Sequence, residues 1–329
     1  MHLKSHLNLW SPLGITAAAL LALMLLGSSA HGSVLKPELL DDETYAETYT
    51  AVVDLNDGTY ILAQLLFSNA GLGDGKAGCR VLVVPKGKKG SNAAGRFDRD
   101  EWSFSGGKLK VGPCSLSTGG GRTRFVAKAE KLKVELDLGK TARRVRPPGY
   151  RVKVEDDFYD GELLIPWAPV KAKVTAPGAP GGSVSGNAYL DHTRSTALVP
   201  DLAKRWVRFR GLGGDRATLI QVRKPPRGGD RGWFWRKGEP KPSRLKGAEI
   251  EVNKSGGGYT LKIQTPEGPV TVTTSKSLFR YEPVKQYGVL GRLAKSWVGN
   301  PITITYRASL EDGRGEPVNG ILEVGLTRR

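Results

Sequence analysis

Alternation of charged and aliphatic residues is the most regular pattern along the chain. Residues 131–138 read Lys-Leu-Lys-Val-Glu-Leu-Asp-Leu without a break, so the leucines and the valine share one face of an extended strand. The same two-residue period recurs in residues 151–154 and 302–306. The 43 glycines include many Gly-Asp, Asp-Gly and Gly-Gly pairs, which are typical of tight turns. These patterns predict an antiparallel, mostly β protein.

Helical periodicity is sparse. The best candidate helix lies between Pro283 and Val298, where apolar residues recur at spacings of three to four, namely Tyr287, Leu290, Leu293 and Trp297. A long all-β chain must protect its sheet edges from pairing with other chains, and closing a sheet into a barrel removes them. We therefore expect closed sheets with few short helices.

The N-terminal segment reads as a secretory signal. A run of apolar residues from Ala17 to Leu26 follows Lys4, and Ser28, Ser29 and Ala30 offer small residues for cleavage. The run is shorter than the ~20 residues that a transmembrane helix needs, and a retained anchor is the alternative. We predict that residues 1–30 are a signal peptide and that the mature protein is secreted or periplasmic.

The remaining chain has a length that suits two domains. Residues 52–64 and 206–221 each show a strand, a turn and a second strand that ends in glutamine, which suggests an internal repeat, although hairpins of this kind also arise by chance. Residues 176–183, between the two copies, are rich in proline and glycine and are typical of a linker. We predict an N-terminal domain at residues 34–182 and a C-terminal domain at residues 183–329.

The chain is strongly basic. Its 50 lysines and arginines against 32 acidic residues give a net charge of +18, which favours anionic surroundings. Export and the spread of charge over many strands argue against nucleic acid as a partner, whereas association with an anionic membrane or envelope surface fits both. Cys79 and Cys114 either pair in an oxidising compartment or stay as buried thiols, and they form no zinc signature.

Candidate chemistry centres on residues 186–192. The other histidines of the chain lie within or beside the predicted signal peptide, at positions His2, His6 and His31, so a histidine-rich metal site is nearly excluded. On a strand, Tyr189 and Asp191 share one face, while His192 points the other way. In an apolar cavity the pKa of Asp191 rises, so the residue can donate a proton near neutral pH. The alternatives are a turn-capping aspartate, a packing tyrosine and a structural histidine.

Tryptophans and arginines provide candidate ligand contacts. The tryptophans that could line a cavity for an acyl or polyene chain, or simply pack in the core, are Trp167, Trp206, Trp233 and Trp235. Trp206, Arg208 and Arg210 share one strand face. Arg208 and Arg210 either bind an acid group of a ligand or hold Asp191 ionised. The second case would lower the pKa of Asp191 and prevent proton donation.

Three segments, residues 60–69, 186–192 and 205–210, resemble the tandem lipocalin-like proteins of the AttH/CrtC type, which include carotenoid 1,2-hydratase (hydroxyneurosporene synthase). The resemblance implies an all-β fold of two tandem lipocalin-like antiparallel β-barrels that enclose an elongated apolar tunnel. For the hydratase branch it implies that Tyr189 and Asp191 protonate an isolated alkene, and that Trp167 is similar to a tunnel tryptophan. Ala188 and Thr193 depart from the glycine and asparagine usual in that segment.

The sequence favours an exported protein that binds an elongated hydrophobic molecule, a lipid or an isoprenoid, in an apolar cavity between two barrels. No metal and no organic cofactor is expected. The first alternative is a cofactor-independent hydratase or cyclase, a lyase of the carotenoid 1,2-hydratase kind, in which Asp191 is the general acid and Tyr189 orients it or the attacking water. The second is a basic protein that interacts with the anionic envelope surface.

Overall fold

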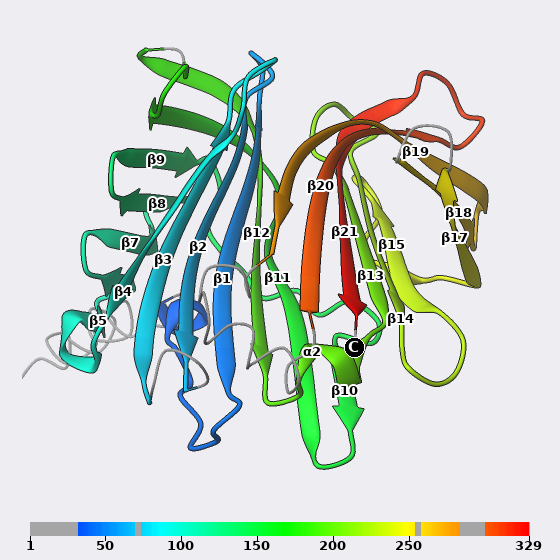
Figure 1. Ribbon diagram of the computed structural model, residues 1–329. Coiled ribbons are helices and arrows are strands. Elements are labelled where there is room, and N and C mark those ends of the chain that lie inside the picture. The colour runs from blue at the N-terminus through cyan, green and yellow to red at the C-terminus, as the bar shows by residue number, and fades with distance from the viewer. Residues whose placement is uncertain (1–31, 70–73, 180, 254–257, 283–299, 329) are drawn as a thin grey trace, which may run out of the picture.

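The computed structural model describes residues 32–69, 74–179, 181–253, 258–282 and 300–328. Nearly all the elements in these ranges are strands, and they form two curled antiparallel sheets that stand side by side (Figure 1). The predicted all-β class with two tandem lipocalin-like barrels is thereby confirmed. The predicted signal peptide at residues 1–30 and the candidate helix at residues 283–298 lie outside the described residues.

The first sheet has 12 strands in the order β4-β3-β2-β1-β12-β11-β9-β8-β7-β6-β5, and β10 pairs with β11 off this path. Two short 3-10 helices, η1 (Gly32–Leu35) and η2 (Arg99–Glu101), accompany it. Its strands are β1 (Ala46–Leu55), β2 (Tyr60–Ser68), β3 (Lys76–Val84), β4 (Ser91–Phe97), β5 (Trp102–Ser105), β6 (Lys108–Val111), β7 (Cys114–Gly119), β8 (Arg122–Ala129), β9 (Leu132–Leu138), β10 (Arg151–Val154), β11 (Asp157–Thr175) and β12 (Ser183–Ser195).

The second sheet has 9 strands in the order β16-β15-β14-β13-β21-β20-β19-β18-β17. A single α-helical turn in the described ranges, α2 (Val199–Leu202), connects the sheets. No helix there meets the length and hydropathy that a membrane span requires. The strands are β13 (Arg205–Gly211), β14 (Thr218–Lys224), β15 (Arg231–Arg236), β16 (Ser243–Arg244), β17 (Gly247–Asn253), β18 (Gly258–Thr265), β19 (Gly268–Tyr281), β20 (Asn300–Glu311) and β21 (Val318–Arg328).

Both sheets have the same arrangement of first and last strands. In each sheet the first strand pairs with the last, β1 with β12 and β13 with β21, and the hairpins β1–β2 and β13–β14 occupy equivalent places. These hairpins contain the two similar sequence segments. Because β12 pairs with β1 and β11, the chain changes sheet between Ser195 and Arg205, whereas the predicted domain boundary precedes β12.

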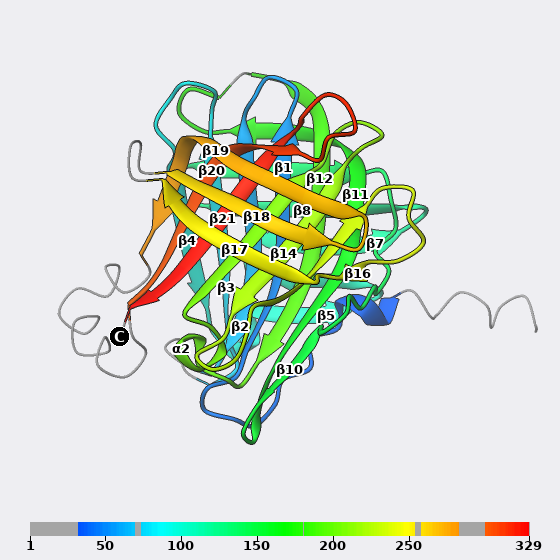
Figure 2. The ribbon, with the colours of Figure 1, turned by 90° about the vertical axis from the view of Figure 1, so that its right-hand side faces the viewer.

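The apolar side chains form three clusters. One fills the inside of the first sheet, one fills the inside of the second, and the third lies between the sheets and contains side chains from both. Figure 2 views the pair from the side of the second sheet, whose strands lie over those of the first. In β9 every second residue is buried, as the alternation of residues 131–138 predicted.

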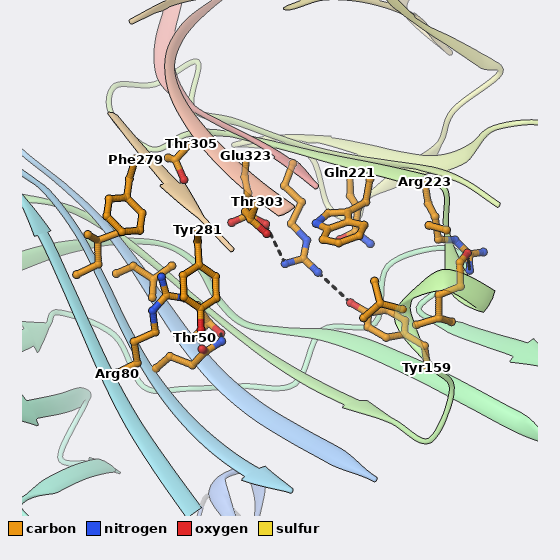
Figure 3. Close-up of a pocket in the computed structure, with 18 residues that line it drawn as sticks. Thr50, Arg80, Tyr159, Gln221, Arg223, Phe279, Tyr281, Thr303, Thr305 and Glu323 are labelled. Atoms are coloured by element: carbon orange, nitrogen blue, oxygen red, sulfur yellow. Dashed lines mark hydrogen bonds and ion pairs between the residues drawn. The ribbon is translucent and has the colours of Figure 1, made fainter. Parts of the chain in front are cut away.

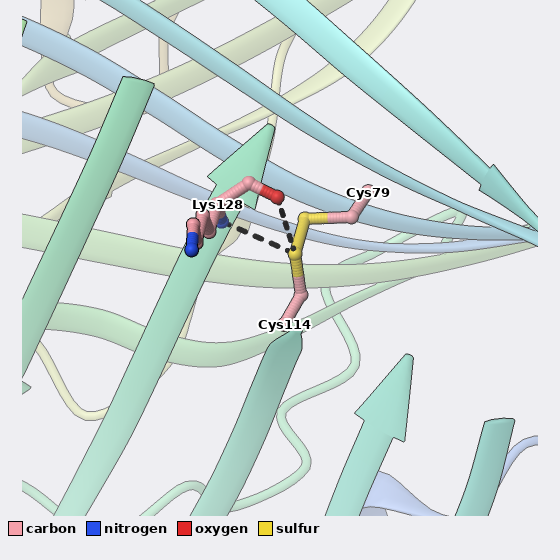
Figure 4. The surroundings of a disulfide bond; sticks show 3 residues. All are labelled: Cys79, Cys114 and Lys128. Atoms are coloured by element: carbon pink, nitrogen blue, oxygen red, sulfur yellow. Dashed lines mark hydrogen bonds between the residues drawn. A yellow bond between two sulfur atoms is a disulfide. The ribbon is translucent and has the colours of Figure 1, made fainter. Parts of the chain in front are cut away.

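A disulfide bond joins Cys79 of β3 to Cys114 of β7 (Figure 4). The two strands are far apart in the order of the sheet, so the bond can form only because the sheet curls and brings them face to face. The backbone amide of Lys128 on β8 donates to Cys114 Sγ at 3.2 Å. Of the two alternatives left by the sequence, the paired state is the one present, and it holds the first sheet closed.

Candidate ligand-binding site between the sheets

A cavity of about 300 Å³ lies between the two sheets (Figure 3). This volume is at the lower end of the range for small-molecule sites. Strands of both sheets and helix α2 contribute to its wall. Its apolar surface is formed mainly by Leu62, Leu82, Leu202, Trp206 and Phe279. The cavity is therefore a mostly apolar space that neither sheet could enclose alone.

Strand alternation explains why the first sheet lines the cavity. Leu62 and Gln64 of β2 are opposite Leu82 and Arg80 of β3, and Thr50 of β1 is opposite Gln64. Residues opposite one another in neighbouring strands share a face of the sheet. That face points at the second sheet, while the intervening residues fill the inside of the first.

Trp206 of β13 lines the cavity because its neighbour is a glycine. Gly325 of β21 is the residue opposite Trp206, and a Cβ atom at position 325 would lie 1.7 Å from the Trp206 ring. Only a residue without a side chain permits the indole to lie across β21. The predicted ligand contact Trp206 thus depends on a glycine in the neighbouring strand.

Arg208, the other predicted contact in the cavity wall, connects the two sheets. Its Nη2 donates to the hydroxyl of Tyr159 on β11 at 3.0 Å, and its Nη1 lies 3.5 Å from Oε1 of Glu323 on β21 (Figure 3). Burial disfavours the charged form of Glu323, but Arg210 and Arg208 outweigh it and lower the pKa of this carboxyl. The wall therefore holds a buried carboxylate between two arginines.

Tyr189 and Asp191 share the face of β12 that points at the second sheet, as alternation predicted. Both are buried, and the Tyr189 hydroxyl donates to Asp191 Oδ2 at 2.9 Å. Nη2 of Arg210 lies 3.8 Å from the same oxygen, and the Arg210 guanidinium stands over the Tyr189 ring at 4.7 Å. Neither Tyr189 nor Asp191 lines the 300 Å³ cavity, which Arg208 and Glu323 border instead.

The protonation of Asp191 reflects competing effects. Burial raises the pKa of this carboxyl above its ordinary value, although Arg208, Arg210 and the Tyr189 hydroxyl oppose the rise. Its Oδ1 accepts no hydrogen bond from the described residues, and neither Nη atom of Arg210 donates one. The aspartate therefore has both the raised pKa that proton donation needs and the arginine neighbour that opposes it.

The remaining predicted tryptophans do not line this cavity. Trp167 and Trp235 belong to different sheets and pack together in the cluster between them, with ring centroids 4.8 Å apart. The Trp235 indole donates to the carbonyl of Glu239 at 3.0 Å. Trp233 lines a second, neighbouring cavity. The structure thus brings these side chains to one interface, where Trp167 and Trp235 join the sheets.

His192 points into the first barrel. Its Nε2 lies 2.7 Å from Glu47 Oε1, its Nδ1 lies 3.7 Å from Glu162 Oε2, and the Tyr49 ring stacks on it at 4.4 Å. Burial favours the neutral ring, but the carboxylates of Glu162 and Glu47 outweigh it and raise the pKa of His192. In the described ranges no three side chains of His, Cys, Asp or Glu group as metal ligands.

Several wall residues were not predicted. The Arg80 guanidinium lies 3.6 Å from the centre of the Tyr281 ring and donates to Asn92 Oδ1 at 2.8 Å. Arg80 precedes four apolar residues, and Glu323 stands alone between apolar residues of β21. A single charge inside an apolar strand is a sign of a buried partner, and this sign was present in the sequence.

Two curled antiparallel sheets with a cavity between them form the tandem lipocalin-like fold of the AttH/CrtC type, so the implied likeness is confirmed for the fold. The chain is similar to an AttH protein from Nitrosomonas europaea, with a TM-score of 0.59, 12% identity and coverage of 87% of this chain and 93% of that one. It is also similar to kievitone hydratase from Nectria haematococca, with a TM-score of 0.52, 10% identity and coverage of 86% and 88%.

A third similar structure is that of CghA with Sch210972, with a TM-score of 0.54, 10% identity and coverage of 87% of this chain and 89% of that one. No protein-family model matches the sequence, and no curated protein matches it. At such low identities the three structures show what the fold is, while activity must be argued from the residues of this chain.

Proposed function

We propose that the protein binds an elongated, largely apolar molecule, a lipid or an isoprenoid, in the cavity between its two sheets. The observation that carries this proposal is the cavity itself, a space of about 300 Å³ whose exposed surface is mostly apolar, with Leu62, Leu82, Phe279 and Trp206 in its wall beside polar side chains. A mostly apolar surface with placed polar groups is typical of small-molecule sites. The fold shared with kievitone hydratase and CghA is consistent with it.

Mass spectrometry of lipids that co-purify with the protein tests this proposal directly. We expect a bound hydrophobic molecule in the unmodified protein and its loss in Leu62→Trp, which fills the cavity from β2. Leu40→Trp is the matched control, because Leu40 is exposed and lies outside the cavity wall. Equal lipid content in both variants and in the unmodified protein would refute binding in this cavity.

Export is part of the proposal. The signal peptide predicted at residues 1–30 motivates it, and the disulfide between Cys79 and Cys114 supports it, since such bonds persist mainly in oxidising compartments. Fractionation of cells that express the full chain would test it. Recovery of the protein in the cytoplasm with its N-terminus intact would contradict export.

A second candidate function is acid catalysis, the hydration or cyclisation of an isoprenoid alkene with Asp191 as general acid. The observation that favours it is the buried Asp191 carboxyl, whose pKa is raised and which is held by the Tyr189 hydroxyl. Asp191→Asn keeps the shape and removes the acid. Turnover of acyclic isoprenoid alkenes should then fall by about 100-fold or more, with unchanged ligand affinity. Unchanged turnover would exclude the role.

A further inference from the structure

A second cavity, of about 600 Å³, adjoins the first. Three residues line both cavities, Tyr159 of β11 together with Gln221 and Arg223 of β14. The two cavities therefore adjoin and share these three residues in their walls. Their linings differ, because the wall of the second cavity is rich in arginine and lysine.

Three of the four arginines of the second cavity are placed in register by the strands of the second sheet. Arg223 of β14 lies directly opposite Arg231 of β15, and Trp233 of β15 lies opposite Arg244 of β16. Residues at such positions share one face of the sheet, so the three guanidinium groups and the indole face the same cavity. Like charges directly opposite one another destabilise a sheet, so this arrangement has a cost that a bound anion would relieve.

Arg223, Arg231 and Arg244 have no carboxylate partner among the described residues, whereas Arg151, which lines the cavity from β10, is paired with Asp160 at 2.7 Å. Arg223 has only a long contact of 3.5 Å, from its Nη1 to the carbonyl of Leu202, and burial together with Arg231 lowers its pKa. Asp230 also lines the cavity, but no ion pair joins it to Arg223, Arg231 or Arg244 in the described structure. The cavity thus holds more positive charge than its own side chains neutralise.

The opposite end of the same strand behaves differently. Arg236, five residues after Arg231 on β15, lies 2.6 Å from Glu267 and 2.7 Å from Asp312. Arg314 also lies 2.7 Å from Glu267. Arg236 and Arg314 are thus paired with carboxylates, whereas Arg223 and Arg231, which line the second cavity, have no carboxylate partner in the described structure.

We propose that the second cavity binds the oxyanion headgroup, a carboxylate or a phosphate monoester, of an amphiphile whose apolar chain occupies the first cavity. This inference rests on the proposed function and adds the chemical class of the ligand. Planar guanidinium groups bind such oxyanions through paired hydrogen bonds. Tyr159 stands where headgroup and chain would meet, and its hydroxyl is already held by Arg208.

Calorimetry with matched ligands tests the proposal. The probes are palmitate, hexadecyl phosphate, hexadecanol and inorganic phosphate. The two anionic amphiphiles should bind about tenfold or more tightly than hexadecanol, as charged hydrogen bonds predict, and inorganic phosphate alone should bind far more weakly than hexadecyl phosphate. The relative affinities for palmitate and hexadecyl phosphate identify the preferred headgroup.

Substitution then locates the headgroup. Arg231→Gln with Arg244→Gln should reduce affinity for the anionic amphiphiles to that for hexadecanol, while hexadecanol binding stays unchanged, because neither arginine lines the first cavity. Arg244→Gln alone should give a smaller loss, because Arg244 lies one strand further from β14. Arg124→Gln on β8 is the control, since Arg124 is exposed and lines neither of the two cavities. Circular dichroism verifies that each variant folds.

The outcomes separate the two proposals. If hexadecanol binds as tightly as palmitate and hexadecyl phosphate, or if the double variant keeps its preference for them, the headgroup site is refuted while the apolar cavity stands. If inorganic phosphate binds as tightly as hexadecyl phosphate, the second cavity is an independent anion site and the amphiphile proposal is refuted. If none of the amphiphiles binds, both proposals fail.

Discussion

The two faces of strand β12 carry two buried charged clusters that differ in how closely their ions are paired. On the inner face, Glu47 accepts hydrogen bonds from His192 at 2.7 Å, Tyr45 at 2.7 Å and Tyr49 at 3.1 Å. On the outer face, the distances from Arg210 to Asp191 and Glu323 are 3.8 Å and 3.6 Å.

The difference in ion-pair distances indicates which of the two clusters is structural. Buried charges are stable when hydrogen bonds replace the water they lose, and the inner cluster, which we define as His192, Glu47 and Glu162, meets this condition at Glu47. The outer cluster, which we define as Tyr189, Asp191, Arg210, Arg208 and Glu323, keeps unused donors and acceptors at Asp191, Arg208 and both Nη atoms of Arg210, whereas in the inner cluster His192 Nδ1 and Glu162 Oε2 lack a hydrogen bond within the described residues. Loose pairing of this kind suits a surface that must accommodate a ligand.

Removal of Glu47 should give the largest effect on stability. Glu47→Ala leaves His192 buried beside an empty space, which should lower the free energy of unfolding by about 3–5 kcal/mol. Asp191→Ala should cost only about 1–2 kcal/mol, because Glu323 still balances the arginines of the outer cluster. Urea denaturation measures both. Equal losses of unfolding free energy in the two variants would contradict the distinction between the inner and outer faces.

Loss of the disulfide should be the next largest effect. Replacing Cys79 and Cys114 by alanine opens a loop with a sequence separation of 35, which corresponds to about 3–4 kcal/mol of unfolding free energy. Both cysteines belong to the inner core, so ligand affinity should be unchanged while the protein stays folded. A weaker ligand affinity in the folded variant would mean that the inner core also shapes the cavity.

Gly325→Ala should act on the outer face. The new methyl group would overlap the Trp206 ring, so overpacking should cost about 1–3 kcal/mol, and the displaced indole should weaken ligand binding. Gly119→Ala on β7 is the control, because a Cβ there meets nothing within 4 Å. Tryptophan fluorescence and ligand titration report the change. Unaltered ligand binding would mean that Trp206 does not contact the ligand.

The pH dependence of stability should show the smallest effects. It should distinguish the two faces of β12, because His192 and Asp191 titrate in different pH ranges. The pKa of His192 is raised above its ordinary value of 6.5 by the carboxylates of the inner cluster, so its contribution is present below pH 6.5 and lost as pH rises through the folded-state pKa. The pKa of Asp191 is raised from 3.8 by burial. Its contribution to the free energy of unfolding is therefore present below pH 3.8 and is lost as pH rises through the folded-state pKa.

Matched variants assign each pH range. His192→Gln should remove the decline in the free energy of unfolding that begins above pH 6.5, and Asp191→Asn should remove the one that begins above pH 3.8. Denaturation midpoints across the pH range measure both slopes. A slope that survives its own substitution would assign that titration to another group.

The sequence predicted those features that depend only on residues close in the chain, such as the face of a strand on which a side chain lies. The alternation of residues 131–138 is the alternation of burial in β9, and the placement of Tyr189 and Asp191 on one face of β12 follows from the same period of two. The glutamines of the two similar segments, Gln64 and Gln221, both reach the first cavity from opposite sheets.

Contacts between distant segments could not be predicted. The sequence left open whether Arg208 and Arg210 contact a ligand or Asp191, and only the structure places Arg210 3.8 Å from this carboxyl. The spacing of Cys79 and Cys114 likewise does not decide whether they pair. β12 belongs to the first sheet through its pairing with β11, which directly precedes it, and with β1, which lies more than a hundred residues earlier. Sheet register and the packing of two sheets arise from the whole core at once.

Strand β12 places side chains both in the inner core of the first sheet and between the two sheets, and this limits how the chain can vary in length. Inserting or deleting one residue in a strand moves every following side chain to the opposite face. In β12 such a change would turn Tyr189 and Asp191 into the barrel and expose Leu190 and His192 to the second sheet. Variation by insertion should therefore accumulate in the hairpin loops, while β12 keeps a fixed number of residues between its two turns.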